Sequence, residues 1–150
     1  MNTKAAVDDF LAQRSLAVVG VSRSGKKFGN MAYRELKGKG YQLFPIHPEA
    51  EVLEGDKCYA NLDVLPEPIG GVLIIVPPTG TEQVVRDAAA AKIPRVWMQQ
   101  GAESEEAIRF CKEHGISVVA GECILMFAEP LRFYHKPHRW VWKLLGKLPK

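Results

Sequence analysis

Short apolar runs alternate with segments of helical periodicity along most of the chain. The runs predict strands over residues 16–19, 41–46, 57–60, 69–76, 95–98 and 117–120. Apolar residues recur three and four apart over residues 8–14, 30–37, 81–91 and 105–113, which predicts helices there. Thr81 and Ser104 are the expected N-caps of the last two helices, because their hydroxyl groups can accept hydrogen bonds from backbone amides.

The alternation of strands and helices predicts an α/β fold. Connections of this kind join parallel strands through right-handed crossovers, so helices cover both faces of the sheet. The strand over residues 16–19 is apolar at every position, as expected for a strand that is buried on both faces. We therefore expect a doubly wound sheet of about five parallel strands, with a ligand at the carboxyl ends of the strands.

The loop after the first core strand combines small, hydroxylated and cationic residues. These residues are Gly20, Val21, Ser22, Arg23, Ser24, Gly25, Lys26 and Lys27. A helix that begins after such a loop directs backbone N–H groups and the positive end of its dipole at one point. The loop therefore predicts a site for a phosphate group.

Two known phosphate-binding motifs nearly match this loop. Gly20-x-Ser22-x-x-Gly25 is the dinucleotide fingerprint with serine in place of its middle glycine. A P-loop needs a Ser or Thr where this chain has Lys27, and an Asp that binds magnesium after a second apolar strand. That strand ends in Pro77 and Pro78, so a nucleoside triphosphatase is disfavoured. A tight turn with solvated lysines is the alternative that involves no ligand.

Other segments that follow strands are polar, small or rigid, and we expect them to converge on the same edge of the sheet. They are His47 with Pro48, Val76 with Pro77 and Pro78, Gln100 with Gly101, and Cys123. An NAD-binding domain has an Asp or Glu near the end of the second strand, where this chain has His47. NAD binding is therefore disfavoured. His47 suits a further phosphate or an adenine ring, and a plain loop histidine is the alternative.

Length and composition place the chain among ordinary globular proteins. A domain of 150 residues buries roughly 70% of its unfolded surface. No apolar run approaches the roughly 20 residues of a membrane-spanning helix, and the N-terminal residues lack a signal-peptide core. We therefore expect a cytoplasmic protein with no transmembrane segment. Cys58, Cys111 and Cys123 show no paired spacing and predict free thiols.

The net charge of +3 conceals an asymmetry between the body of the chain and its C-terminal tail. Six of the 20 basic residues follow Glu129, the last acid, so the body carries 14 basic and 17 acidic side chains. The basic pI therefore describes the tail, and nucleic acid is not an expected ligand. His135 and His138 have the spacing of two metal ligands, but no further ligand is implied, so no metal site is predicted.

The tail over residues 131–150 predicts a basic amphipathic helix. Its apolar face is formed by Trp140, Val141, Leu144, Leu145 and Leu148. Docking onto its own domain, a homodimer, a membrane surface, and an acidic or nucleic-acid partner are the open alternatives for this face.

The segments at the strand ends, taken together, resemble the CoA-binding domain family, small proteins similar to the nucleotide-binding domain of the succinyl-CoA synthetase α subunit. The resemblance covers about residues 11–130. Its matching segments include residues 19–22, 40–41, 45–48, 65–66, 76–78, 96–101, 106–107 and Cys123. The resemblance implies a Rossmann-like domain over residues 1–130 that binds coenzyme A or an acyl-CoA.

The resemblance also implies a role for each matching segment. Gly20, Val21, Ser22 and Arg23 would lie along the pyrophosphate, with Lys26 or Lys27 neutralising it. His47 and Pro48 would approach the adenosine and its 3′-phosphate, and Val76, Pro77 and Pro78 would line the adenine and pantetheine path. The synthetase uses a phosphorylated histidine on a further domain, so ligase activity is not implied here.

We expect binding without catalysis, because the sequence offers no pair of nucleophile and base. Cys123 is the best single candidate for a reactive residue, and a small thiol packed beneath the site is its alternative. An NAD(P)-binding oxidoreductase and an interaction protein that acts through its basic tail are the alternative functions.

Overall fold

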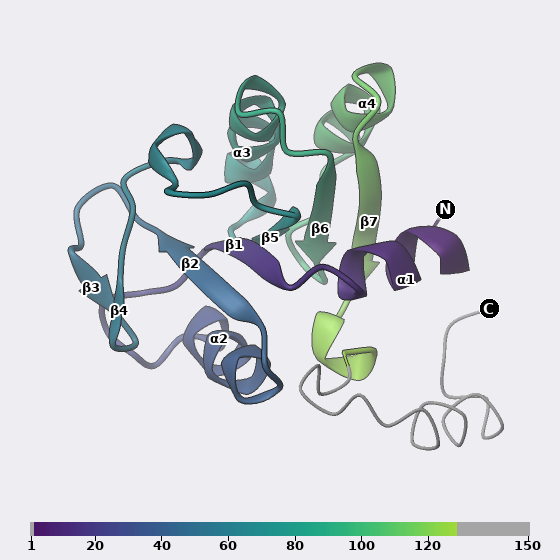
Figure 1. Ribbon diagram of the computed structural model, residues 1–150. Coiled ribbons are helices and arrows are strands. Elements are labelled where there is room, and N and C mark those ends of the chain that lie inside the picture. The colour runs from purple at the N-terminus through teal and green to yellow at the C-terminus, as the bar shows by residue number, and fades with distance from the viewer. Residues whose placement is uncertain (1, 129–150) are drawn as a thin grey trace, which may run out of the picture.

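The computed structural model describes residues 2–128, which form a parallel sheet covered by helices (Figure 1). In this part of the chain the sheet has five strands: β1 (Ser15–Val19), β2 (Gln42–Ile46), β5 (Gly71–Ile74), β6 (Arg95–Gln99) and β7 (Ser117–Glu122). The α-helices are α1 (Lys4–Leu11), α2 (Phe28–Gly38), α3 (Pro78–Ala90) and α4 (Glu105–Glu113). The antiparallel pair β3 (Val52–Leu53) and β4 (Asp56–Lys57) follows β2, and short 3-10 helices cover Leu62–Val64 (η1) and Ile124–Met126 (η2).

The strand order is β2-β1-β5-β6-β7, and each neighbouring pair is parallel. The chain winds from β1 toward β2 in one direction and from β5 through β6 to β7 in the other. The winding therefore reverses between β1 and β5, and Figure 1 shows α2 and α3 on opposite sides of the sheet. Ligands of doubly wound sheets bind at such a reversal point, outside the carboxyl ends of the strands. The expected α/β, Rossmann-like fold with about five parallel strands is confirmed.

Alternation along the strands divides the apolar side chains between two cores. Leu73 and Trp97 pack on the face covered by α1, α2 and η2. Val72 and Val96 pack on the other face, with α3, α4 and η1. All four side chains are fully buried. Burial of each such side chain contributes about 1.5–3 kcal/mol to stability, so the central strands give the loops at their ends a fixed base.

Several element boundaries differ from the sequence prediction. Helix α1 begins at Lys4 and ends at Leu11, not at 8 and 14, because Thr3 Oγ1 accepts a hydrogen bond from the Ala6 amide at 3.0 Å. Strand β5 is shorter than the expected 69–76. The expected edge strand over 57–60 is wrong: β4 ends at Lys57, and Tyr59 forms a single bridge to Ile46.

The remaining predictions on the C-terminal part of the chain lie outside the described residues. These are the basic helix over 131–150, the domain boundary after residue 130, and the His135 and His138 pair. Within residues 2–128, no helix has the length and apolar character needed to cross a membrane. The same residues contain no cluster of three or more His, Cys, Asp or Glu side chains suited to a metal ion.

Candidate functional site

Gly20 makes the turn from β1 into the loop that leads to α2. Its φ is +125°, a conformation that residues with a Cβ rarely adopt. A Cβ on Gly20 would lie 2.0 Å from the carbonyl oxygen of Ile75, just after β5. A Cβ on Gly29, in the first turn of α2, would lie 2.2 Å from the carbonyl oxygen of Gly20. The two glycines therefore hold β1, β5 and the start of α2 in close backbone contact, whereas Gly25 faces open space.

Two serines fold the loop onto itself. Ser22 Oγ accepts a hydrogen bond from the Ser24 amide at 3.0 Å, and Ser24 Oγ accepts one from the Lys26 amide at 3.2 Å. The Gly25 amide donates to the Ser22 carbonyl at 3.4 Å. These three amides are therefore engaged inside the loop. Donors for an anion can come from side chains, from the start of α2, and from the amides of Val21 and Arg23, which have no acceptor within residues 2–128.

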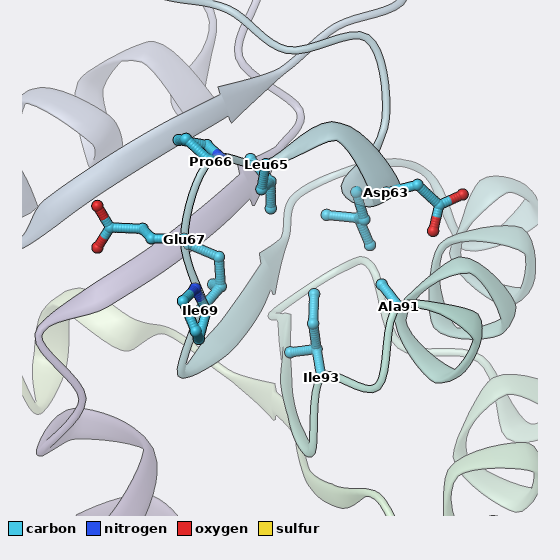
Figure 2. A pocket seen from close by; sticks show the side chains of 9 residues that line it. Asp63, Leu65, Pro66, Glu67, Ile69, Ala91 and Ile93 are labelled. Atoms are coloured by element: carbon cyan, nitrogen blue, oxygen red, sulfur yellow. The ribbon is translucent and has the colours of Figure 1, made fainter.

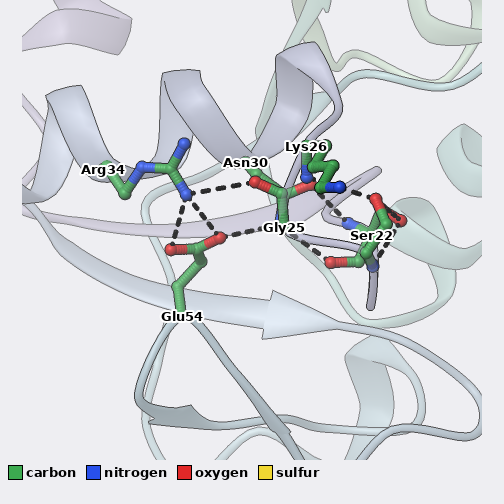
Figure 3. A network of polar contacts seen from close by, with 7 residues as sticks. Ser22, Gly25, Lys26, Asn30, Arg34 and Glu54 are labelled. Atoms are coloured by element: carbon green, nitrogen blue, oxygen red, sulfur yellow. Dashed lines mark hydrogen bonds and ion pairs between the residues drawn. The ribbon is translucent and has the colours of Figure 1, made fainter.

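Asn30 fixes Ser22 from the side of the helix. Its side chain is buried, Oδ1 accepts a hydrogen bond from the Ser22 amide at 3.1 Å, and Nδ2 donates to the Ser22 carbonyl at 2.8 Å. Nδ2 also donates to Oε2 of Glu54, in the turn between β3 and β4, at 2.8 Å. Arg34 Nη1 lies 2.9–3.0 Å from the two carboxylate oxygens of Glu54 and donates to the Gly25 carbonyl at 3.4 Å (Figure 3).

Glu54 is charged in this network. The hydrogen bond from Asn30 and the guanidinium of Arg34 hold the pKa of the Glu54 carboxyl group below its ordinary value, against the opposing effect of burial. The neighbouring carboxylate of Asp56, on β4, pairs with Lys37 at 2.9 Å and accepts a hydrogen bond from Tyr33. Burial and Asp56 raise the pKa of the Tyr33 hydroxyl group. Helix α2 and the β3–β4 hairpin are thus joined by two carboxylates.

The start of α2 has positive charge nearby and no side-chain cap. Lys27 is the N-cap residue, no side chain caps the helix, and its first turn contains no acid. The amides of Lys27 and Phe28 have no acceptor among residues 2–128, and Lys26 and Lys27 form no ion pair there. A helix N-terminus carries roughly half a positive charge. This end of α2 is therefore suited to bind an anion.

The loop after β2 lies beside the loop after β1. Arg23 and Glu49 join the two loops through an ion pair of 3.2 Å, with both side chains more than half exposed. His47 Nδ1 accepts hydrogen bonds from the amides of Glu49 and Ala50 at 3.0 and 3.1 Å. In the neutral ring this leaves the proton on Nε2, which can donate to an oxygen. Pro48 is exposed on the same loop.

The turn after β5 leads directly into α3. Val76 is half-buried, whereas Pro77 and Pro78 are exposed. The helix begins at Pro78, so the expectation that Thr81 is its N-cap is wrong. Proline at the first helical position has a preset φ and no N–H group that needs a cap. Thr81 is buried in the first turn instead, where its hydroxyl group donates to the Ala102 carbonyl at 2.6 Å.

Gln100, Gly101 and Cys123 lie at the same edge, on the far side of the reversal point. Gln100 and Gly101 are exposed after β6, and their amides donate to the Glu122 carbonyl at 3.2 Å and to Glu103 Oε1 at 2.7 Å. Cys123 is partly exposed after β7. Strands are about 4.8 Å apart, so the end of β7 is roughly 14 Å from that of β1. The predicted residues therefore extend along the edge rather than forming one small cluster.

The three cysteines are free thiols, as expected. Cys58 and Cys111 are buried, and burial raises the pKa of both thiols, that of Cys111 to about 12. A thiol of such high pKa is a poor nucleophile at neutral pH. Cys58 and Cys111 are therefore packing residues.

An open groove lies at the opposite edge of the sheet, before β5 and β6. Its volume is about 390 Å³, and it is lined by Leu62, Asp63, Leu65, Pro66, Glu67, Pro68, Ile69, Ala91 and Ile93 (Figure 2). The residues predicted to bind a ligand are not part of its lining. Asp63 and Glu67 are the charged groups of this lining, and carboxylates repel a phosphate ligand. The groove is therefore separate from the candidate site.

Asn30, Arg34 and Glu54 were not identified as site residues by the sequence analysis. Asn30 was identified only as a helix start, and Glu54 belongs to a polar, glycine-containing segment with no clear periodicity. Asn is an ordinary residue at the start of a helix, so nothing in the sequence indicates that this side chain is buried. The partner 24 residues away, Glu54, had no signal either.

The fold and the site define a doubly wound α/β domain with a cationic, uncapped helix start at its reversal point. A family model described as CoA binding domain matches residues 14–129. The chain belongs to this family, which confirms the resemblance found in the sequence.

Individual relatives include both short proteins and long ligases. The uncharacterized protein YneT of Bacillus subtilis is 30% identical over 124 residues, which cover 81% of this chain and 91% of that protein. The structure of a hypothetical protein from Pyrococcus horikoshii matches with a TM-score of 0.77 and 28% identity, covering 82% of this chain and 87% of the other. The alpha subunit of ADP-forming acetate–CoA ligase II from Pyrococcus furiosus is 22% identical over 79% of this chain, which spans 28% of the subunit.

Proposed function

We propose that this chain binds coenzyme A or an acyl-CoA and does not catalyse a reaction on it. The observation that carries the proposal is the uncapped start of α2, flanked by lysines, at the reversal point of a domain of this family. The pyrophosphate of coenzyme A suits this position, because free backbone amides and the helix dipole both favour an anion.

The proposed pyrophosphate contacts come from one loop and combine backbone, hydroxyl and cationic groups. They are Gly20, Val21, Ser22, Arg23, Lys26 and Lys27. The Val21 side chain is buried in the core, so Val21 contributes backbone only. Arg23 is paired with Glu49 on the surface, where an ion pair contributes only about 0–1 kcal/mol. A phosphate can therefore replace Glu49 as the partner of Arg23.

The rest of the proposed ligand extends along the edge of the sheet. The residues proposed to line it are His47, Pro48, Val76, Pro77, Pro78, Gln100, Gly101 and Cys123. The Nε2–H group of His47 can donate a hydrogen bond to the 3′-phosphate. Pro77 and Pro78 offer a rigid apolar surface to the adenine and pantetheine. The edge carries lysines at the start of α2 and prolines after β5, which supports the assignment of the charged and apolar parts of coenzyme A to these two segments.

Binding without catalysis is the second part of the proposal. Within residues 2–128, no serine or cysteine side chain is hydrogen-bonded to a histidine side chain, which supports this part of the proposal. The ligase activity in the name of the Pyrococcus furiosus relative is not transferred, because this chain spans 28% of that subunit. A cytoplasmic location and a homodimer stay predictions.

Calorimetric titration of the full chain with coenzyme A, dephospho-CoA and NAD tests the proposal. We expect saturable binding of coenzyme A, weaker binding of dephospho-CoA because the contact of the 3′-phosphate with His47 is lost, and little binding of NAD. Equal binding of all three ligands, or binding of none, would contradict it.

A further inference from the structure

We infer that Asn30 and Glu54 are positioning residues for the proposed CoA-binding loop, an inference that rests on the proposed function. Hydrogen bonds and one ion pair form a closed circuit (Figure 3). The circuit runs from Ser22 to Asn30, then to Glu54, then to Arg34, and from there to Gly25. The hydrogen bond from the Gly25 amide to the Ser22 carbonyl closes it. The circuit therefore holds both ends of the loop from Ser22 to Gly25.

The β3–β4 turn carries Glu54 at this contact. Glu54 and Gly55 have φ values of 52° and 81°, the positive values that a two-residue turn between antiparallel strands favours. The Glu54 side chain is only 12% exposed although it is charged. The cost of burying this charge is offset by the hydrogen bond from Asn30 and the ion pair with Arg34. The hairpin thus presents a carboxylate to the base of the loop.

Glu54 and the Ser22 backbone require the same orientation of the Asn30 amide group. An ionised carboxylate can only accept hydrogen bonds, so the Asn30 nitrogen must face Glu54. The Asn30 oxygen then faces the Ser22 amide, and the shared nitrogen also reaches the Ser22 carbonyl. The reverse orientation would place two acceptors together at Glu54 and at the Ser22 carbonyl, and two donors together at the Ser22 amide. Glu54 therefore reinforces, from a different element, the orientation of Asn30 that holds the Ser22 backbone.

The sign of the effect distinguishes positioning from simple electrostatics. Glu54 is a negative charge next to the loop that is proposed to hold a polyanion. If charge were its only effect, Glu54→Gln would remove a repulsion and tighten binding of coenzyme A. If Glu54 positions the loop, the same variant weakens binding, because glutamine has one acceptor oxygen and no charge where the carboxylate holds both Asn30 and Arg34.

The test is a titration of coenzyme A into five variants and the wild-type chain, with thermal unfolding measured for each. We expect Asn30→Ala to weaken binding about tenfold, the effect of about one hydrogen bond, and Glu54→Gln to weaken it less. Asn30→Asp places two carboxylates together and also weakens binding. The double variant Asn30→Asp with Glu54→Gln restores a donor opposite an acceptor, and we expect it to bind more tightly than Asn30→Asp alone.

Lys37→Gln is the matched control, because it removes the other ion pair between α2 and the hairpin, at 2.9 Å, without touching the loop. Its affinity for coenzyme A should equal that of the wild type. Tighter binding by Glu54→Gln, equal loss in Lys37→Gln, or no rescue in the double variant would overturn the inference. A wild-type chain that does not bind coenzyme A would instead contradict the proposed function.

Discussion

The starts of α2 and α4 lie at the same edge of the sheet but are built differently. Helix α4 is capped by its own residues: Ser104 Oγ accepts a hydrogen bond from the Ala107 amide at 3.3 Å, and Glu105 and Glu106 lie in the first turn. Helix α2 has no side-chain cap and no acid in its first turn, and Lys26 and Lys27 precede it. The cap of α4 by Ser104 was predicted correctly from the sequence.

This contrast indicates which loop is left for a ligand. The positive end of α4 is neutralised by two carboxylates, so an external anion would gain little there. The start of α2 lies at the reversal point, where the Lys27 and Phe28 amides have no acceptor and Lys26 and Lys27 form no ion pair within residues 2–128. Helix α3 resembles α2 in having neither a side-chain cap nor an early acid. Among the α-helices of residues 2–128, the two without a side-chain cap, α2 and α3, are those that flank the reversal point.

The largest expected effect comes from closing the space at the start of α2. Gly29→Ala should lower the free energy of unfolding by about 3 kcal/mol, because the new Cβ would lie 2.2 Å from the Gly20 carbonyl oxygen. Gly38→Ala, at the other end of the same helix, has open space and should raise it by about 0.5 kcal/mol. Urea denaturation measures both, and equal effects would contradict the close approach.

Removing the cations at the start of α2 should affect binding and not the fold. We expect the double variant Lys26→Gln with Lys27→Gln to bind coenzyme A about tenfold more weakly, with a smaller difference at high salt. Lys112→Gln, in the last turn of α4, is the control and should bind as the wild type does. An unchanged affinity in the double variant would show that the two lysines do not contribute to binding.

Removing the side-chain cap of α4 should change stability and leave binding unchanged. Ser104→Ala should lower the free energy of unfolding by about 1 kcal/mol, since the Ala107 amide loses its acceptor. Its affinity for coenzyme A should stay the same at a temperature where the variant is folded. A substantial loss of affinity without loss of stability would place the ligand at α4 instead.

The ion pair between Glu54 and Arg34 should have a smaller effect on stability, which is seen at acid pH. The pKa of Glu54 is lower in the folded chain than its ordinary value, so this residue stabilises the fold at pH values above its ordinary pKa. The stabilisation is lost as pH falls through the folded pKa. Chemical denaturation across acid pH should therefore show a shallower decline in Glu54→Gln than in the wild type. Parallel declines would show that Glu54 has no such role.

The fold was predictable because its signals are local. Strand β1 is a continuous apolar run and α4 has both a cap and a hydrophobic stripe, so each element can be recognised from its own residues. The prediction that Thr81 caps α3 is wrong although Thr81 has the chemistry of a cap. Its hydroxyl group donates instead to the carbonyl of Ala102, 21 residues away. The proline pair before Thr81 determines the start of α3.

The candidate site was predictable only in part, for the same reason. The loop after β1 is recognisable from its glycines, serines and lysines, and the residues proposed to contact the ligand follow from its place after a strand. The support for that loop comes from Glu54 in a hairpin whose two strands have only two residues each. Such short strands have no measurable periodicity, so the contact with Asn30 could be found only in three dimensions.

Amide NMR during a titration with coenzyme A is the sharpest test of the proposed binding site. We predict saturable shift changes at the amides of Lys27, Phe28 and Gly29, at the start of α2. We also predict that the amides of Glu105, Glu106 and Ala107, at the start of α4, change little. Saturable changes at α4 with none at α2, or no saturable change at either helix, would contradict the proposed site.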